Sequence, residues 1–167
     1  MNATVTTVEL SALQRTERQA QVVKGLEAKL PQHALLWNNE DTTPYECDGL
    51  TAYRQRPLVV ALPENEAQVA AVLKTCYALG VPVVARGAGT GLSGGAMPNA
   101  QGVTLSMAKC SNVLNLDSVA RTATVQCGVR NLAISEAAAP LGLYYAPDPS
   151  SQIACTIGGN VAENSGG

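Results

Sequence analysis

Residues 81–95 read Val-Pro-Val-Val-Ala-Arg-Gly-Ala-Gly-Thr-Gly-Leu-Ser-Gly-Gly, a short apolar run followed by a segment in which five of ten residues are glycine. The apolar run is typical of a strand that is buried on both faces. A similar run at residues 58–62 ends at Pro63, and between the two runs Asn65 is a suitable N-cap for an amphipathic helix that ends at Gly80. The order strand, helix, strand predicts a βαβ unit with parallel strands.

The part of the chain before this unit is less regular. Thr16 and Gln19 form a capping-box pattern, which predicts a helix at residues 17–30 that ends at Pro31. Residues 32–56 show no clean periodicity and contain scattered polar residues, which predicts an irregular strap over the core.

The part after the glycine-rich segment changes to shorter, β-like runs at residues 103–107, 113–116 and 122–129. The last of these alternates apolar and polar residues, as a half-buried strand does, and residues 131–140 predict one further short helix. We therefore expect an α+β fold, with a parallel βαβ unit followed by a small mixed or antiparallel sheet with helices. The chain stops directly after an apolar, glycine-rich segment, which indicates the front piece of a longer protein.

Composition excludes several classes of function. A length of 167 residues predicts one domain, and a net charge of −2 with a pI near 5.3 argues against nucleic acid as a partner. No apolar run approaches the roughly 20 residues that a membrane span needs, and the N-terminus lacks a secretory signal, so a cytoplasmic location is expected. The five cysteines are expected to be free thiols, and the single histidine, His33, makes a metal site or a catalytic triad improbable.

The glycine-rich segment is the strongest chemical signal. Glycines let successive backbone N–H groups converge on an anion, which predicts a loop that holds phosphate. Gly89, Gly91 and Gly94 match GxGxxG, but no long helix and no suitably spaced acid follow, and no lysine completes a P-loop. Two alternatives stay open: the glycines only make tight turns, or Arg86 is a solvated residue at a strand end rather than a charge partner of the phosphate.

Two later segments are candidates for polar contacts with a ligand. Residues 144–152 contain two prolines that stiffen the backbone around Asp148, Ser150, Ser151 and Gln152, although a plain surface turn is an alternative. Residues 156–167 contain two Gly-Gly pairs, against which a flat ring system fits. A flexible linker is the alternative there, but Ile153, Ile157 and Val161 recur every four residues and indicate packing.

Four segments together closely resemble the FAD-binding domain of the vanillyl-alcohol-oxidase and p-cresol-methylhydroxylase family, and within it the glycolate-oxidising members. They are residues 44–50, 86–95, 128–134 and 144–167, so the likeness covers roughly residues 36–167. The resemblance implies a PCMH-type FAD-binding fold at residues 53–167, preceded by a helix and strap at residues 1–52. It also implies that this fold is incomplete, because the family's remaining strands and its substrate-binding cap domain follow, so no catalytic residue is assigned.

The resemblance further implies a flavin site. The loop at 86–95 would wrap the FAD pyrophosphate, and the later segments would line the ribityl chain and the isoalloxazine. Members with covalently bound FAD carry a histidine at the position of Thr90, so non-covalent FAD is expected, with no metal. The expected cofactor-binding residues are Arg86, Gly87, Ala88, Gly89, Thr90, Gly91, Leu92, Ser93, Gly94, Gly95, Pro147, Asp148, Pro149, Ser150, Ser151, Thr156, Ile157, Gly158, Gly159, Asn160, Asn164, Ser165, Gly166 and Gly167.

The function implied is the FAD-binding portion of a flavin-dependent 2-hydroxy-acid dehydrogenase or oxidase, which passes hydride from the α-carbon of glycolate or D-lactate to FAD. This chain alone is expected to be inactive. Implied partners are the iron–sulfur and second flavin-domain subunits of a glycolate oxidase complex, which would place the protein in the cytoplasm or at the inner face of the membrane. A non-catalytic nucleotide-binding or assembly module is an alternative, and an NAD-linked Rossmann oxidoreductase is a weaker one.

Overall fold

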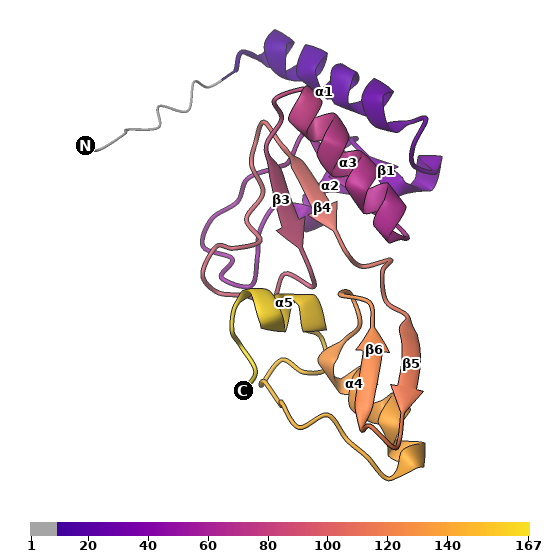
Figure 1. The fold of residues 1–167 in the computed structure, drawn as a ribbon. Helices are drawn as coiled ribbons and strands as arrows, with labels where there is room; N and C mark the ends of the chain where they lie inside the picture. The colour runs from indigo at the N-terminus through magenta and orange to yellow at the C-terminus, as the bar shows by residue number, and fades with distance from the viewer. Residues whose placement is uncertain (1–9) are drawn as a thin grey trace, which may run out of the picture.

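The computed structural model describes residues 10–167, which form an upper lobe around a four-stranded sheet and a lower lobe around a β-hairpin (Figure 1). Residues 1–9 lie outside the described residues. The prediction that the N-terminus lacks a secretory signal concerns mainly this segment. The upper lobe contains α1 (Ala12–Leu26), η1 (Gln32–Ala34), β1 (Leu35–Leu36), α2 (Asn39–Thr42), η2 (Thr43–Tyr45), β2 (Val59–Ala61), α3 (Glu66–Ala78), β3 (Val83–Arg86) and β4 (Val103–Ser106). The lower part contains β5 (Val113–Asp117), β6 (Thr122–Val125), α4 (Asn131–Ala138), η3 (Ala139–Leu141) and α5 (Ile157–Ala162).

The upper sheet has the strand order β1-β2-β4-β3, in which β2, β4 and β3 are parallel and β1 is antiparallel to β2. The predicted strand, helix and strand are present, with Asn65 capping α3 by accepting the Gln68 N–H at 3.0 Å. The prediction that the second strand is buried on both faces is wrong, because β3 lies at the edge of the sheet and is only partly buried. However, β2 and β3 are not neighbours, because β4 lies between them. All four residues of β4 are buried, so the centre of the sheet is filled by a strand that follows the βαβ unit in sequence.

The first helix begins five residues earlier than the sequence predicts. Ser11 is its N-cap, and its side chain and that of Gln14 form a reciprocal capping box. Thr16, which the prediction placed at the cap, instead lies inside the helix and donates its hydroxyl to the Ala12 carbonyl. Both pairs have the same spacing, so local pattern alone does not decide between them, and the helix ends at Leu26 rather than at residue 30.

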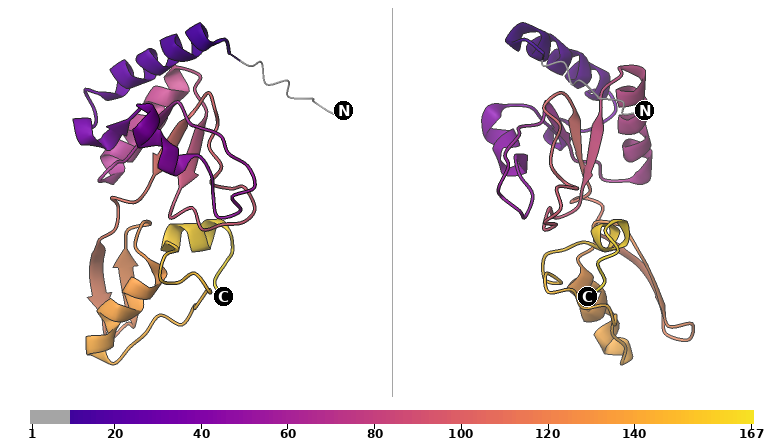
Figure 2. Two further views of the ribbon diagram at one scale, coloured as in Figure 1. Left: turned by 180° about the vertical axis from the view of Figure 1, so that it is seen from behind. Right: turned by 90° about the vertical axis from the view of Figure 1, so that its left-hand side faces the viewer.

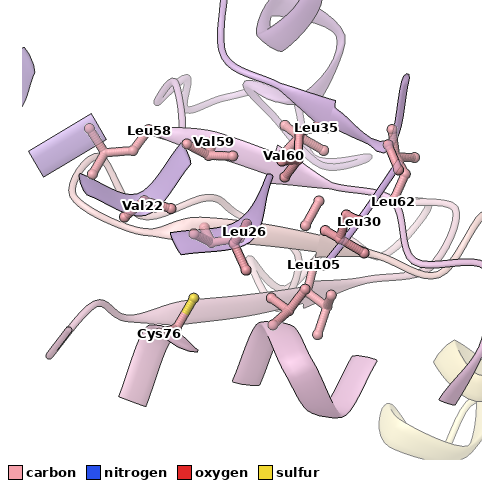
Figure 3. Packing of buried hydrophobic residues seen from close by; sticks show 14 of the residues in the cluster. Val22, Leu26, Leu30, Leu35, Leu58, Val59, Val60, Leu62, Cys76 and Leu105 are labelled. Carbon is pink, nitrogen blue, oxygen red and sulfur yellow. The ribbon is translucent and has the colours of Figure 1, made fainter. Parts of the chain in front are cut away.

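The core of the upper lobe lies between the sheet and the helices α1 and α3 (Figures 1 and 3). Val22 and Leu26 of α1 are fully buried against the sheet, as are Val59 and Val60 of β2. Each such side chain contributes about 1.5–3 kcal/mol by leaving water. Burial of every residue from 58 to 62 confirms the prediction that this strand is covered on both faces.

The strap at residues 32–56 contains short elements that the sequence does not reveal. The two-residue strand β1 pairs with β2 through Leu35 and Leu36, and α2 and η2 follow it. These elements are too short to show a periodicity, and β1 is placed by its pairing with β2.

The lower lobe departs from prediction in two places. β6 ends at Val125 and most of its residues are exposed, so the alternation at 122–129 does not mark a half-buried strand. The chain turns there because the Gly128 N–H donates to the Cys110 carbonyl at 2.8 Å, away from the hairpin. The prediction of a helix at 131–140 is confirmed by α4 and η3.

The glycine-rich end of the chain contains a helix that the sequence analysis missed. α5 lies between the two lobes, seen most clearly in the two views of Figure 2. Its first turn is fixed by tertiary hydrogen bonds, from the Ile157 N–H to the Val129 carbonyl and from the Gly158 N–H to the Cys127 carbonyl. The packing inferred from the four-residue spacing is wrong, because Ile153 and Val161 are 66% and 75% exposed.

Candidate functional site

Three segments that the sequence singled out meet at one cavity of about 880 Å³. The cavity opens at the carboxyl end of β3, where α5 and the preceding loop face the upper sheet (Figure 1). The carboxyl ends of parallel strands are a frequent place for ligand sites in proteins with such sheets. The predicted residues that line it are residues 86–93, 95, 149–151, 156, 158–160 and 165.

Other predicted residues do not line the cavity. They are Gly94, Pro147, Asp148, Ile157, Asn164, Gly166 and Gly167. Asp148 and Gly167 do lie together, since a Cβ on Gly167 would be 2.9 Å from the carbonyl carbon of Asp148. The cavity also has lining residues that the prediction omitted, which are Val83, Val84, Ala85, Ala96, Met107, Cys127, Cys155, Ala162 and Glu163.

Some of these omissions carry a sequence signal and others do not. Val83, Val84 and Ala85 directly precede the glycine-rich loop in the predicted strand, so their proximity to the site follows from the prediction itself. Cys127 and Cys155 have no spacing motif, and they reach the cavity only through the fold of the lower lobe.

The glycine-rich loop presents a row of unsatisfied donors. Within residues 10–167, the backbone N–H groups of residues 87–93 donate no hydrogen bond to the protein. Gly89 and Gly94 have φ values of +73° and +80°, which other residues rarely adopt. Consecutive free N–H groups with alternating backbone conformation form a concave site for an anion.

A buried carboxylate holds this loop in shape. Asp48, only 4% exposed, accepts the Gly94 N–H at 2.9 Å with one oxygen and the Leu50 N–H at 3.0 Å with the other. The Gly49 N–H donates to the Gly91 carbonyl at 3.0 Å, and a Cβ on Gly49 would lie 2.6 Å from the Thr90 carbonyl oxygen. The strap therefore fixes the loop through Asp48 and Gly49. This role of Asp48 was not predicted from the sequence.

Arg86 also faces inward rather than into solvent. Its Nη1 donates to the carbonyl oxygens of Cys47 at 2.7 Å and Ala96 at 3.4 Å, and its guanidinium lies 5.8 Å from the centre of the Tyr45 ring. Gly89 packs on this guanidinium so closely that a Cβ there would overlap it. The solvated alternative for Arg86 is therefore wrong, and its positive charge lies directly beneath the loop.

The opposite wall of the cavity comes from the start of α5. The buried hydroxyl of Thr156 has no hydrogen-bond partner, and it lies where a Cβ on Gly87 would be. Asn160 donates from Nδ2 to the Ser165 carbonyl at 2.7 Å, so its side chain shapes the turn after the helix. The carboxylate of the exposed Glu163 lies at the edge of the cavity, 3.8 Å from a Cβ built on Gly91.

Two cysteines near the lower wall differ in exposure. Cys127 is exposed and lines the cavity, whereas Cys110 is buried, and its Sγ donates to the Pro63 carbonyl at 3.3 Å. Burial, with a smaller effect from Cys127, raises the pKa of the Cys110 thiol.

Within residues 10–167 no group of three His, Cys, Asp or Glu side chains is arranged to hold a metal ion. No helix in the same part of the chain is both long and apolar enough to cross a bilayer.

Comparison with known proteins identifies the family. A family described as FAD binding domain matches residues 57–167, which is most of the chain. The chain belongs to this family of FAD-binding domains. The PCMH-type α+β fold expected from the sequence is confirmed by a crystal structure of p-cresol methylhydroxylase, which has a TM-score of 0.70 and 20% identity over 83% of this chain and 28% of that one.

Several curated relatives of the chain have names that refer to the oxidation of 2-hydroxy acids. It is 60% identical to the glycolate oxidase subunit GlcD of Escherichia coli K12 over 87% of this chain and 29% of the relative. It is 39% identical to a D-lactate dehydrogenase of Anaerostipes hadrus over 77% of this chain and 26% of that protein. The chain thus spans less than a third of the length of these relatives.

The geometry of the cavity fits a flavin dinucleotide. The free N–H groups of residues 87–93, with Arg86 beneath them, match the charge of a pyrophosphate. Gly158 and Gly159 line the opposite wall, where Gly158 packs closely against Cys127, and the buried Thr156 hydroxyl there has no hydrogen-bond partner in the protein. Neither a lysine of a P-loop nor a long helix follows the loop, in agreement with the sequence analysis.

Proposed function

We propose that the 880 Å³ cavity binds FAD non-covalently, with the backbone N–H groups of residues 87–93 holding the pyrophosphate. The observation that carries this proposal is the row of donors without protein acceptors, at the mouth of a cavity in an FAD-binding family. Arg86 adds charge while positioning the loop, and Thr90 stands where covalent attachment would require a histidine.

The other expected residues take the remaining parts of the cofactor in this proposal. Residues 149–151, 156, 158–160 and 165 line the ribityl chain and the isoalloxazine, while residues 147, 148, 157, 164, 166 and 167, which do not line the cavity, support the adjoining backbone. Residues 53–167 form the flavin-binding domain, and the residues up to 52 contribute a helix and the strap that carries Asp48. Proximity of these segments in the structure supports the assignment.

The longer protein to which the chain corresponds is proposed to oxidise a 2-hydroxy acid such as glycolate or D-lactate. FAD, when bound, would accept the hydride from the substrate α-carbon. The role of this chain's residues is to bind and orient the cofactor, while residues that bind the carboxylate and take the proton are expected in the relatives' remaining length. Identity of 60% to a glycolate oxidase subunit supports this substrate class.

Assembly with other subunits follows from the same relationship. The E. coli relative is by name a subunit, which supports a multi-subunit complex for this protein. We propose an iron–sulfur subunit and a second flavin-domain subunit as its partners, through which it would associate with the inner face of the membrane. Co-purification of the longer protein with an iron–sulfur protein tests this arrangement.

The flavin site is tested by titrating the chain with FAD and following the quenching of flavin fluorescence. Gly91→Val is the diagnostic variant, because Gly91 lines the cavity and the nearest protein atom to a Cβ there is 3.8 Å away, so the side chain starts without overlapping the protein. Ala120→Val, on the exposed turn between β5 and β6, is the matched control.

We expect saturable binding of FAD that is lost in Gly91→Val and kept in Ala120→Val, with unchanged circular dichroism in both. NAD serves as a parallel ligand. Binding of NAD without FAD would contradict the proposal and favour the nicotinamide alternative. In the longer protein, glycolate or D-lactate added without oxygen should bleach the visible flavin absorbance. A flavin that binds but is never bleached would favour the non-catalytic module.

A further inference from the structure

A second cavity, of about 180 Å³, lies at the opposite end of the parallel sheet from the flavin cavity. The glycine-rich loop follows the carboxyl end of β3, whereas Arg56 and Pro57 precede the amino end of the parallel strand β2. Helix α1 provides Arg15 and Gln19 to the walls, and Trp37 and Asn39 come from the segment around the start of α2. The two cavities are therefore separated by the length of the strands.

Among the described residues 10–167, the charges that line this cavity are positive. Arg15 and Arg56 both line it, and neither takes part in any ion pair found among residues 10–167. Arg15 donates instead to backbone carbonyls, those of Arg56 at 3.3 Å and Pro57 at 3.2 Å and that of Ala100. Burial, and then the charge of Arg56, lowers the pKa of Arg15, as expected for two like charges in a confined space.

The cavity also holds hydrogen-bond donors that the fold does not use. The side-chain amide of Gln19 is already hydrogen-bonded within the fold, because its Nε2 donates to the carbonyls of Trp37 at 3.1 Å and Leu58 at 2.7 Å. In contrast, the guanidinium of Arg56 and the side-chain amide of Asn39 have no hydrogen-bond partner in the part of the chain that the structure describes. A guanidinium fork and an amide are a suitable donor set for a carboxylate or phosphate group.

We infer that this cavity binds a small oxyanion, with Arg56 as its principal ligand, Asn39 as a second donor and Arg15 as a fixed charge behind them. The volume admits a single phosphate or carboxylate group and excludes a dinucleotide. This site does not depend on the flavin, because none of its residues lines the larger cavity.

Trp37 provides a direct readout, because it is the only tryptophan of the chain and lies in the wall of the cavity. The flavin-free chain is titrated with sodium phosphate, with chloride adjusting the ionic strength to a constant value, while tryptophan fluorescence is followed. A second titration uses malonate, which separates a preference for phosphate from one for carboxylates. Thermal unfolding with and without each anion gives an independent measure of binding.

We expect a saturable change in fluorescence for at least one of the two anions, with a matching rise in melting temperature. Arg56→Gln should weaken the binding of that anion at least tenfold, because a charged hydrogen-bond donor is lost. Arg121→Gln, an exposed arginine of the hairpin turn, is the control and should bind as the unaltered chain does. Asn39→Ala should weaken binding to a smaller extent, and it provides a second variant if Arg56→Gln does not fold.

Two results would overturn the inference. One is a fluorescence response that rises linearly with both anions and never saturates. The other is equal binding by the unaltered chain, Arg56→Gln and Asn39→Ala, which would place the anion elsewhere.

Discussion

Replacement of Gly128 by alanine tests how the lower lobe is joined to the proposed flavin cavity. Gly128 lies where residues 126–129 cross residues 107–110 with no space for a side chain. A Cβ built there would lie 2.7 Å from the Cys110 carbonyl oxygen and would overlap that of Met107, whereas an ordinary carbon to oxygen contact is about 3.3 Å or longer. Both neighbours are backbone atoms, so a rotamer change cannot relieve the clash.

The cost of Gly128→Ala follows from these contacts. Separating the two segments loses the hydrogen bond from the Gly128 N–H to the Cys110 carbonyl, about 1 kcal/mol, and adds packing strain of about 1–3 kcal/mol. We therefore expect the free energy of unfolding to fall by about 3 kcal/mol, which corresponds to a drop in melting temperature of roughly 6–12 °C. FAD affinity should fall too, because the next residue back, Cys127, accepts the Gly158 N–H that positions α5.

Urea denaturation followed by circular dichroism measures this effect. Gly166→Ala is the matched control, since the nearest atom to its added Cβ is 3.7 Å away, and its stability should change by less than about 0.5 kcal/mol. If Gly128→Ala is as stable as Gly166→Ala, the crossing is not a close backbone contact.

Three further predictions concern the loop, the core and the charge of the cavity. Asp48→Ala removes the acceptor of two backbone N–H groups and should lower the free energy of unfolding by about 3 kcal/mol in urea denaturation; an unchanged midpoint would show that the loop holds itself. Burial raises the pKa of the Cys76 thiol from 9.0 to about 11, so the unfolded chain loses its proton first as pH rises. Stability should be constant below pH 9 and fall by about 2–3 kcal/mol towards pH 11, a decline that Cys76→Ala should lack in pH-dependent unfolding. Glu163→Gln removes a negative charge beside the proposed pyrophosphate site and should tighten FAD binding about two- to fivefold at low salt, less so at high salt; weaker binding would mean that the carboxylate assists the cofactor.

Local signals were sufficient for several parts of the fold and of the candidate site. Asn65 and Gly80 delimit α3 by capping, and the uninterrupted apolar run at 58–62 predicts a strand covered on both faces. The glycine-rich loop after β3 was recognised from composition alone, because glycine at such density has few uses other than close backbone approach. These features depend on residues within a few positions of one another.

For other features the predictions from sequence were wrong, because long-range contacts decide these features. The spacing of Ile153 and Val161 resembles a packed stripe, yet both side chains are exposed. The pair Gly158–Gly159 predicts a flexible or loop conformation, yet both residues lie in α5, whose first N–H groups bond to residues 127 and 129. Helix propensity is a weak prior, and tertiary hydrogen bonds of this kind override it.

By itself, the sequence determined that the chain contains a βαβ unit, that a glycine-rich loop follows its second strand, and that four motifs in order match a flavin-binding family. Only the tertiary structure decided that β4 separates β2 from β3, that Asp48 fixes the loop from 46 residues away, and that Arg86 lies beneath it. The physical reason is that periodicity and capping act over single turns of chain. Strand order and side-chain contacts depend instead on which distant segments bury one another's surface and satisfy one another's backbone groups.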